Sequence, residues 1–128
     1  MGVAVAVTAV AAVAGLAGCS SGGKDGESSG GTSVPSVSIK AGDKTCEISK
    51  TTLPAGRHTF SVQNTSSQVT EVYIYAAGDR IVGEVEDVGP ATTRSLVVDL
   101  PNGSYQVACK PGMAGSGIRT ALTVNGVS

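Results

Sequence analysis

The sequence predicts an all-β domain over residues 34–128, folded as a Greek-key sandwich of about seven to eight strands. Three observations predict this fold class. Short runs that alternate apolar and polar residues, or that are rich in β-branched residues, recur along the stretch. Turn-forming residues separate these runs at short intervals. No run shows the 3.6-residue periodicity of a helix over a useful length.

Four strands are expected in the first half of this domain, at residues 36–39, 45–48, 58–62 and 69–75. Turns or bends are expected between them, at residues 41–43, 53–56 and 64–67. In the third strand, alternation points Phe60 and Val62 inward. In the fourth strand, Glu71 and Tyr73 share one face, and Val72 lies on the other.

Four more strands are expected in the second half, at residues 80–85, 92–100, 105–109 and 118–124. Gly78-Asp79 introduces the first of them, and Gly89-Pro90 separates it from the second. Asn102-Gly103 is expected to supply the positive-φ residues that a tight hairpin needs. In the strand before that turn, the apolar residues share one face and are expected in the core: Leu96, Val98 and Leu100.

The N-terminus is expected to be a targeting segment. Residues 3–16 form an unbroken run of small and apolar residues, too short to span a bilayer and typical of a signal-peptide core. The run ends in Leu16-Ala17-Gly18-Cys19, which resembles the bacterial lipobox. Residues 1–18 are therefore predicted to be a lipoprotein signal peptide, with the mature chain lipidated on Cys19. The alternative is an ordinary secretory signal with a chance cysteine.

Residues 19–33 are almost entirely Ser and Gly after the cysteine, so they are expected to form a flexible tether. Such a tether would reach about 20 Å from the membrane. The net charge of −1 and the lack of a basic patch argue against a nucleic-acid partner. Nothing resembles a nucleophile–base pair, a phosphate-binding loop or paired acids in a cleft, so no enzymatic activity is expected.

Two cysteines remain once Cys19 is assigned to the lipid. In an exported protein, Cys46 and Cys109 are expected either to form a disulfide or to bind a metal ion as thiolates. A disulfide would close about 63 residues and stabilise the fold by about 4 kcal/mol. Two unrelated buried thiols are the third alternative.

Several short motifs occur in one order along the domain: Cys46-Glu47, Leu53-Pro-Ala-Gly56, Val69-Thr-Glu-Val72, Asp79-Arg-Ile-Val82, Val88-Gly-Pro90 and Tyr105-x-x-x-Cys109-Lys-Pro-Gly-Met113. Together they resemble the cupredoxin-like domain of EfeO-type iron-uptake lipoproteins, especially those of actinobacteria. The resemblance covers nearly all of residues 34–124. It implies a protein outside the cytoplasm, lipid-anchored to the cell membrane, that works with an iron permease and a haem peroxidase.

In that family a helical imelysin-type domain with a His-x-x-Glu motif usually follows the sandwich. His58 is the only histidine in this sequence, and the position that the glutamate would occupy holds Ser61. We therefore expect a stand-alone form that lacks the imelysin-type domain. His58 lies in an early strand away from the sulfur-bearing loop, so it is expected to be structural or exposed.

A site for an iron or copper ion is expected, with four candidate ligands: Cys46, Glu71, Cys109 and Met113. The resemblance supports the two cysteines, because matching cysteines are suspected ligands in that family. A blue-copper loop also holds a histidine between its two sulfur ligands, and here the intervening residues are Lys110, Pro111 and Gly112. The usual copper site is therefore incomplete. A carboxylate at Glu71, roughly where the first histidine of a copper site would lie, favours iron over copper.

Each of these side chains has a simpler interpretation. Glu71 could face solvent on a half-exposed strand, and Met113 could fill a gap beneath the Lys-Pro-Gly turn. Glu84 and Glu86 share one face of an extended segment. They are either weak cation ligands or charges that protect an edge strand from aggregation.

The leading hypothesis is a membrane-anchored, extracytoplasmic metal-binding lipoprotein that serves iron acquisition and is not an enzyme. One alternative is a structural or protein-interaction module stabilised by a disulfide. A second alternative is a copper electron-transfer protein, which would need two histidines where the sequence offers one.

Overall fold

In the computed structural model, the described part of the chain is residue 2 and residues 36–126. The predicted signal peptide at residues 1–18, the predicted lipidation site at Cys19 and the predicted tether at residues 19–33 lie outside these described residues, apart from Gly2. The domain boundary predicted at residue 34 also lies just outside them.

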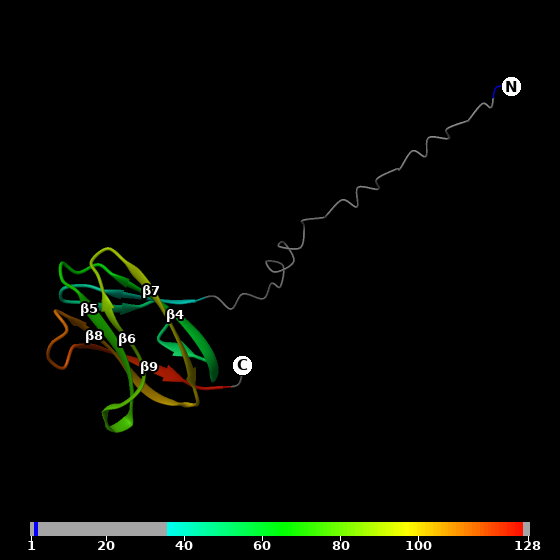
Figure 1. Cartoon of the computed structure of the whole chain (residues 1–128). Helices are drawn as coiled ribbons and strands as arrows, with labels where there is room; N and C mark the ends of the chain where they lie inside the picture. Colours follow the sequence, from blue (N-terminus) through cyan, green and yellow to red (C-terminus); the bar gives the residue numbers. More distant parts are fainter. Residues whose placement is uncertain (1, 3–35, 127–128) are drawn as a thin grey trace. The chain divides into compact units, whose positions relative to one another are not determined.

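The described residues fold into two sheets (Figure 1). The four-stranded sheet has the order β2 (Cys46–Ile48), β1 (Val37–Ala41), β4 (Gly56–Asn64) and β7 (Thr93–Leu100). The five-stranded sheet has the order β3 (Thr52–Leu53), β9 (Ile118–Val124), β8 (Gly103–Pro111), β5 (Thr70–Ala76) and β6 (Arg80–Val88). A single 3₁₀ turn in the described residues, η1 (Ala77–Asp79), joins β5 to β6. The prediction of an all-β sandwich is confirmed.

The strand order shows that the chain crosses repeatedly between the two sheets. β1 pairs with β4 in parallel and β3 pairs with β9 in parallel, whereas every other pair in the two sheets is antiparallel. Parallel neighbours cannot be joined by a tight hairpin, so the connections must pass over the ends of the sandwich. This is the crossing expected of a Greek-key arrangement.

The core lies between the two sheets and is built from alternate residues of each strand. In β4, the four inward side chains are His58, Phe60, Val62 and Asn64, and all four are buried. The largest fully buried apolar side chains come from both sheets: Phe60, Ile39, Ile74, Leu100 and Leu122. The period-2 pattern therefore predicted correctly which residues of β4 and β7 face the core.

The prediction of a hairpin at Asn102-Gly103 was wrong. β7 and β8, the strands on either side, belong to different sheets, and neither Asn102 nor Gly103 has a positive φ. Two-residue hairpins join strands about 4.8 Å apart, whereas facing sheets are separated by about 10 Å. The corner is held instead by the Tyr105 hydroxyl, which donates a hydrogen bond of 2.6 Å to the Pro101 carbonyl oxygen.

The sequence pattern also missed β3. Leu53 falls where a bend was expected and Thr52 lies just before it, and these two residues pair with Thr123 and Val124 at the end of β9. A strand of two residues is too short to show any alternation, so only the tertiary pairing reveals it. The described residues thus contain nine strands. None of their helical segments is long and apolar enough to cross a membrane.

The loop after β4 is tied to two other segments at the end of the sandwich. Asn64 is fully buried, and its Nδ2 donates hydrogen bonds of 2.8 Å to the carbonyl oxygens of Gln68 and Val88. Its Oδ1 accepts hydrogen bonds from the backbone N–H and the hydroxyl of Ser66. The backbone N–H of Gly112 donates to the Val69 carbonyl oxygen at 2.8 Å. The loop that follows Cys109 is therefore fixed against this end.

Candidate functional site

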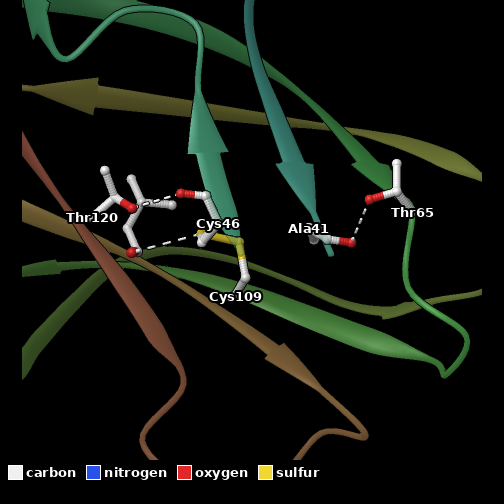
Figure 2. Close-up of a disulfide and its surroundings, with 6 residues drawn as sticks. Ala41, Cys46, Thr65, Cys109 and Thr120 are labelled. Atoms are coloured by element: carbon white, nitrogen blue, oxygen red, sulfur yellow. Dashed lines mark hydrogen bonds between the residues drawn. A yellow bond between two sulfur atoms is a disulfide. The ribbon is translucent and has the colours of Figure 1, made fainter. Parts of the chain in front are cut away.

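Cys46 and Cys109 form a disulfide that links the two sheets (Figure 2). Cys46 begins β2 in the four-stranded sheet, and Cys109 lies near the end of β8 in the five-stranded sheet. The sulfurs are 2.02 Å apart and the Cα atoms 5.5 Å apart. Both residues are buried. Of the three sequence-based alternatives for this pair, the structure contains the disulfide, and in this state neither sulfur is a thiolate ligand.

Two side-chain hydrogen bonds connect the segments around the disulfide. The Thr120 hydroxyl of β9 donates a hydrogen bond of 2.6 Å to the Cys46 carbonyl oxygen (Figure 2). The Thr65 hydroxyl donates to the Ala41 carbonyl oxygen at 3.3 Å. The short strand β2 is therefore held from both sides, by pairing with β1 and by contact with β9.

Glu71 lies on the opposite face of the five-stranded sheet from the disulfide. In the pairing of β5 with β8, Val72 is opposite Cys109 and Glu71 is opposite Lys110. Because successive side chains of a strand alternate between faces, Cys109 points into the core and Glu71 points outward. Val72 and Cys109 belong to the main hydrophobic core, in agreement with this assignment. The structure does not bring the predicted ligands Cys46, Glu71 and Cys109 together.

Met113 lies at the surface, whereas both cysteines are buried. It follows β8 with a φ of 54° and is 42% exposed. The expectation that it packs beneath the Lys-Pro-Gly turn was therefore wrong. Gly112 and Met113 are consecutive positive-φ residues, so the chain reverses sharply at this point.

His58 has a structural role. It is buried, and its Nε2 lies 2.7 Å from the Pro54 carbonyl oxygen. A blue-copper site needs imidazole nitrogens and a cysteine thiolate. Here the histidine is bonded to the backbone and the cysteine to another sulfur, so the described residues do not fit a blue-copper centre. Within residues 36–126, no three His, Cys, Asp or Glu side chains are grouped closely enough to hold a metal ion.

The outer face of the five-stranded sheet carries a compact group of polar side chains, which we name the outer-face cluster: Glu71, Tyr73, Glu86 and Lys110. The Tyr73 hydroxyl donates a hydrogen bond of 2.9 Å to Glu86 Oε1. Lys110 Nζ lies 4.2 Å from the centre of the Tyr73 ring and 3.8 Å from Glu71 Oε1. The side chains of Lys110 and Glu71 are only 14% and 11% exposed. Such sheltered charges are uncommon unless they are paired.

The hydrogen bond to Glu86 raises the pKa of Tyr73 far above its ordinary value. Burial of the ring and the nearby carboxylate of Glu71 raise the pKa further. Each of these effects disfavours a negative charge on the phenol oxygen. Tyr73 is therefore a neutral hydrogen-bond donor at physiological pH.

Glu84 and Glu86 share the outer face, as the sequence predicted. Glu84 lies opposite Tyr73 in the pairing of β5 with β6, and it is exposed. β6 is an edge strand of the five-stranded sheet, so charges along it also protect that edge.

The sequence pattern indicated Glu71 and Glu86 but not Lys110, which pairs with Glu71. In the sequence, Lys110 stands out only as a residue between Cys109 and Met113. Its place one residue after Cys109 could have indicated that it points to the outer face, because strand side chains alternate.

A second polar group on this face centres on Arg119 of β9. The rings of Tyr73 and Tyr75 are stacked, with centroids 5.6 Å apart and planes inclined by 12°. The Arg119 guanidinium lies 4.5 Å from the centre of the Tyr75 ring. Its Nη1 donates hydrogen bonds to Asp79 Oδ1 at 2.7 Å and to Gln106 Oε1 at 3.0 Å. The sequence offered no signal for this group, because its members come from three separate segments.

Comparisons with known proteins found a matching family model and several similar proteins. A family model described as a cupredoxin-like domain matches residues 6–124. The iron uptake system component EfeO of Yersinia pseudotuberculosis is 36% identical over 76 residues, which cover 59% of this chain and 20% of that protein. EfeO of Escherichia coli is 33% identical over 76 residues, with the same coverage of 59% and 20%. The chain thus matches about a fifth of the length of these relatives.

Solved structures with a similar fold include two auracyanins. Reduced auracyanin from Roseiflexus castenholzii has a TM-score of 0.54 and 19% identity, over 69% of this chain and 94% of that one. Auracyanin A, a "blue" copper protein from Chloroflexus aurantiacus, has a TM-score of 0.53 and 20% identity, over 71% of this chain and all of that one. Identities this low support the shared fold and nothing further.

Proposed function

This chain belongs to the cupredoxin-like domain family, and from that membership we propose that it is an extracytoplasmic component of an iron-uptake system, anchored to the membrane by a lipid on Cys19. The named role of its EfeO relatives supports the assignment to iron uptake. The Cys46–Cys109 disulfide supports a location outside the cytoplasm, because disulfides persist in oxidising compartments.

Iron is the cargo that the outer-face cluster suits best. The observation that carries this proposal is the pair of carboxylates, Glu71 and Glu86, which both lie beside the Tyr73 phenol. These oxygen donors suit iron better than Cu(I), which prefers sulfur ligands. The sulfurs of Cys46 and Cys109 are bonded to each other, so neither is a thiolate that could bind a metal ion.

Binding at this cluster would be weak and reversible. Lys110 lies 3.8 Å from Glu71 and offsets part of its charge, so an incoming cation competes with an ammonium group that is already present. A tether that keeps the domain close to a membrane permease raises its effective concentration there, so modest affinity is sufficient. In this proposal the permease receives the iron, and a haem peroxidase belongs to the same system.

Iron binding to the full chain, isolated without reductant, tests the proposal. Ferric iron would be supplied as its citrate complex, and the bound metal measured after equilibrium dialysis. The variants Glu71→Gln and Glu86→Gln remove one charge each at nearly constant shape, and we expect at least about tenfold weaker binding. The control is Asp99→Asn, because Asp99 forms an exposed pair with Arg57 on the four-stranded sheet. Absent binding by the wild type, or equal binding by all variants, would contradict iron capture at this cluster.

The alternative function is a protein-interaction module without a metal ion. It is favoured by the disulfide, which stabilises the fold and occupies both sulfurs. Under this alternative the oxidised chain binds neither iron nor copper, yet it is recovered with the permease or the peroxidase after cross-linking in membranes. Iron binding that depends on Glu71 would argue against it.

A further inference from the structure

A hollow lies on the outer face of the five-stranded sheet, beside the corner formed by η1. Its volume is about 360 Å³, and the residues with polar groups that line it are Tyr75, Asp79, Ser104, Tyr105 and Gln106. Ala76, Ala77 and Ala121 supply apolar surface. The volume falls near the lower end of the range for small-molecule sites, roughly 300 to 1000 Å³. Glu71, Glu86 and Lys110 are not among its lining residues, so it is distinct from the iron-binding proposal.

Arg119 fixes the polar groups around this hollow. Through one nitrogen it binds Asp79 Oδ1 and Gln106 Oε1, and its Nε donates to the Ser116 carbonyl oxygen at 3.2 Å. Its guanidinium also lies against the Tyr75 ring. These contacts leave Asp79 Oδ2 as an acceptor and Gln106 Nε2 as a donor for a ligand. Polar groups held in place before binding lose less entropy when the ligand arrives.

The corner itself is strained. Gly78 and Asp79 both have positive φ values, of 74° and 57°. A left-handed conformation costs a residue with a side chain about 1 kcal/mol or more. The bond from Arg119 offsets part of this cost, and it places the Asp79 carboxylate at the edge of the hollow. Strain that is held by a specific contact is frequently found at binding sites.

The charges at the hollow cancel. Asp79 is the one acidic residue that lines it, and Arg119 forms an ion pair of 2.7 Å with that carboxylate. A free anion or cation therefore gains little net attraction. A neutral ligand with several hydroxyl groups can bind the carboxylate oxygen, the amide N–H and the Ser104 hydroxyl, while its C–H groups contact the alanines.

We propose that this hollow binds a saccharide unit. An uncharged ring that carries hydroxyls on its rim and C–H groups on its faces matches both the polar and the apolar lining. The proposal goes beyond the role in iron uptake and does not depend on it.

Backbone amide NMR spectra of the full chain, titrated separately with cellotriose, maltotriose and chitotriose, test this assignment. For at least one of the three sugars we expect chemical-shift changes confined to residues 75–79, 104–106 and 119–121. The dissociation constant is expected on the order of 1 mM. The proposal is overturned if all three sugars leave these residues unchanged, or if the changes map to another surface.

A pair of arginine variants sharpens the test. Arg119→Lys keeps the charge but loses the Nε donor to Ser116 and the planar guanidinium against the Tyr75 ring, which fix the nitrogen that binds Asp79 and Gln106, so we expect about tenfold weaker sugar binding. Arg57→Lys is the matched control, because Arg57 pairs with Asp99 on the other sheet, and its sugar binding should be unchanged.

If Arg119→Lys lowers the melting temperature strongly, Asp79→Asn replaces it, because the Asp79 side chain is 70% exposed and asparagine tolerates the positive φ at this position. Undiminished sugar binding by Asp79→Asn would overturn the proposal. Iron binding by the same variants should match the wild type, so failure here can be distinguished from failure of the iron proposal.

Discussion

At the scale of single residues, one buried polar side-chain atom among residues 36–126 lowers the stability of the fold. The Thr70 hydroxyl oxygen is buried and has no hydrogen-bond partner among the described residues. Thr70 faces the same side of β5 as Val72, which belongs to the hydrophobic core. A buried hydroxyl without a partner destabilises a fold by roughly 1 to 3 kcal/mol.

We therefore expect Thr70→Val, which has the same shape, to raise the free energy of unfolding by about 1 kcal/mol. Chemical denaturation of both proteins would measure it. Thr120→Val is the control, because the Thr120 hydroxyl donates a hydrogen bond to the Cys46 carbonyl oxygen. The free energy of unfolding of this variant should be about 1 kcal/mol lower than that of the wild type. A Thr70→Val protein less stable than the wild type would show that the hydroxyl has a partner such as bound water.

The Tyr73 phenol predicts a pH dependence of stability. Its pKa is raised in the folded protein, chiefly by the hydrogen bond to Glu86, so folding favours the protonated form. The stabilisation that results from this pKa difference is fully present below the ordinary phenol pKa of about 10. It is lost as the pH rises toward the pKa of Tyr73 in the folded protein. Above pH of about 10, the wild type should therefore lose stability more steeply than Tyr73→Phe.

Unfolding midpoints measured across this alkaline range would test the expectation. Glu86→Gln removes the anion that contributes most to the shift, so its alkaline loss of stability should be smaller than that of the wild type. Parallel curves for the wild type and Tyr73→Phe would refute this account of the tyrosine.

At the scale of secondary-structure elements, the disulfide fastens a weak strand. β2 has only three residues and lies at the edge of its sheet, and it is bonded through Cys46 to β8 of the facing sheet. The bridge spans 63 positions of the sequence. Closing a loop of that length restricts the unfolded chain, so the bridge should contribute about 4 kcal/mol to stability.

The double variant Cys46→Ala/Cys109→Ala should therefore unfold at a lower denaturant concentration, with a free energy of unfolding reduced by about 4 kcal/mol. The reduced wild type provides the control, because it lacks the bond but keeps both sulfur atoms in place. Equal stability of the oxidised wild type and the double variant would exclude the disulfide as a major source of stability.

The contact between β6 and β7 depends on a glycine. A Cβ atom added at Gly83 would lie 2.5 Å from Val98 Cγ2, which is closer than real carbon contacts allow. Gly83→Ala should therefore push β6 away from β7 and destabilise the fold by about 1 to 3 kcal/mol. Thermal melting would measure the loss.

Gly89→Ala is the matched control for this change. Its added Cβ would meet Thr92 only at 3.8 Å, an ordinary contact, so little change is expected. A second substitution, Val98→Ala, should recover part of the stability lost in Gly83→Ala, because it removes the clashing methyl group. If it recovers none, the clash is not the cause.

At the scale of the whole molecule, we propose that a lipid on Cys19 anchors the sandwich domain to the membrane. Replacing Cys19 by Ala removes the sulfur that would carry the lipid, so the exported protein should leave the membrane fraction and appear in the soluble fraction. A blot of separated fractions would measure this. The Cys46→Ala/Cys109→Ala variant should remain with the membrane. Retention of Cys19→Ala on the membrane would contradict anchoring through this residue.

The sequence by itself determined the fold class and most of the strands, because side-chain alternation is a local property that survives without knowledge of partners. It placed Phe60, Leu96 and Val98 in the core, and it named the two cysteines that form the bridge. It also placed Glu71 and Tyr73 together on one face of their strand. Whether the cysteines would be oxidised remained open at that level.

Only the tertiary structure decided which strands pair and in which register. The register that sets Val72 opposite Cys109 turns Glu71 away from the disulfide, and no local pattern specifies a register between β5 and β8. No local pattern predicts the contacts of Arg119 either, because its partners Asp79 and Gln106 lie on other segments of the chain. Alternation assigns each side chain to a face of its own strand, whereas the pairing of distant strands decides which side chains meet.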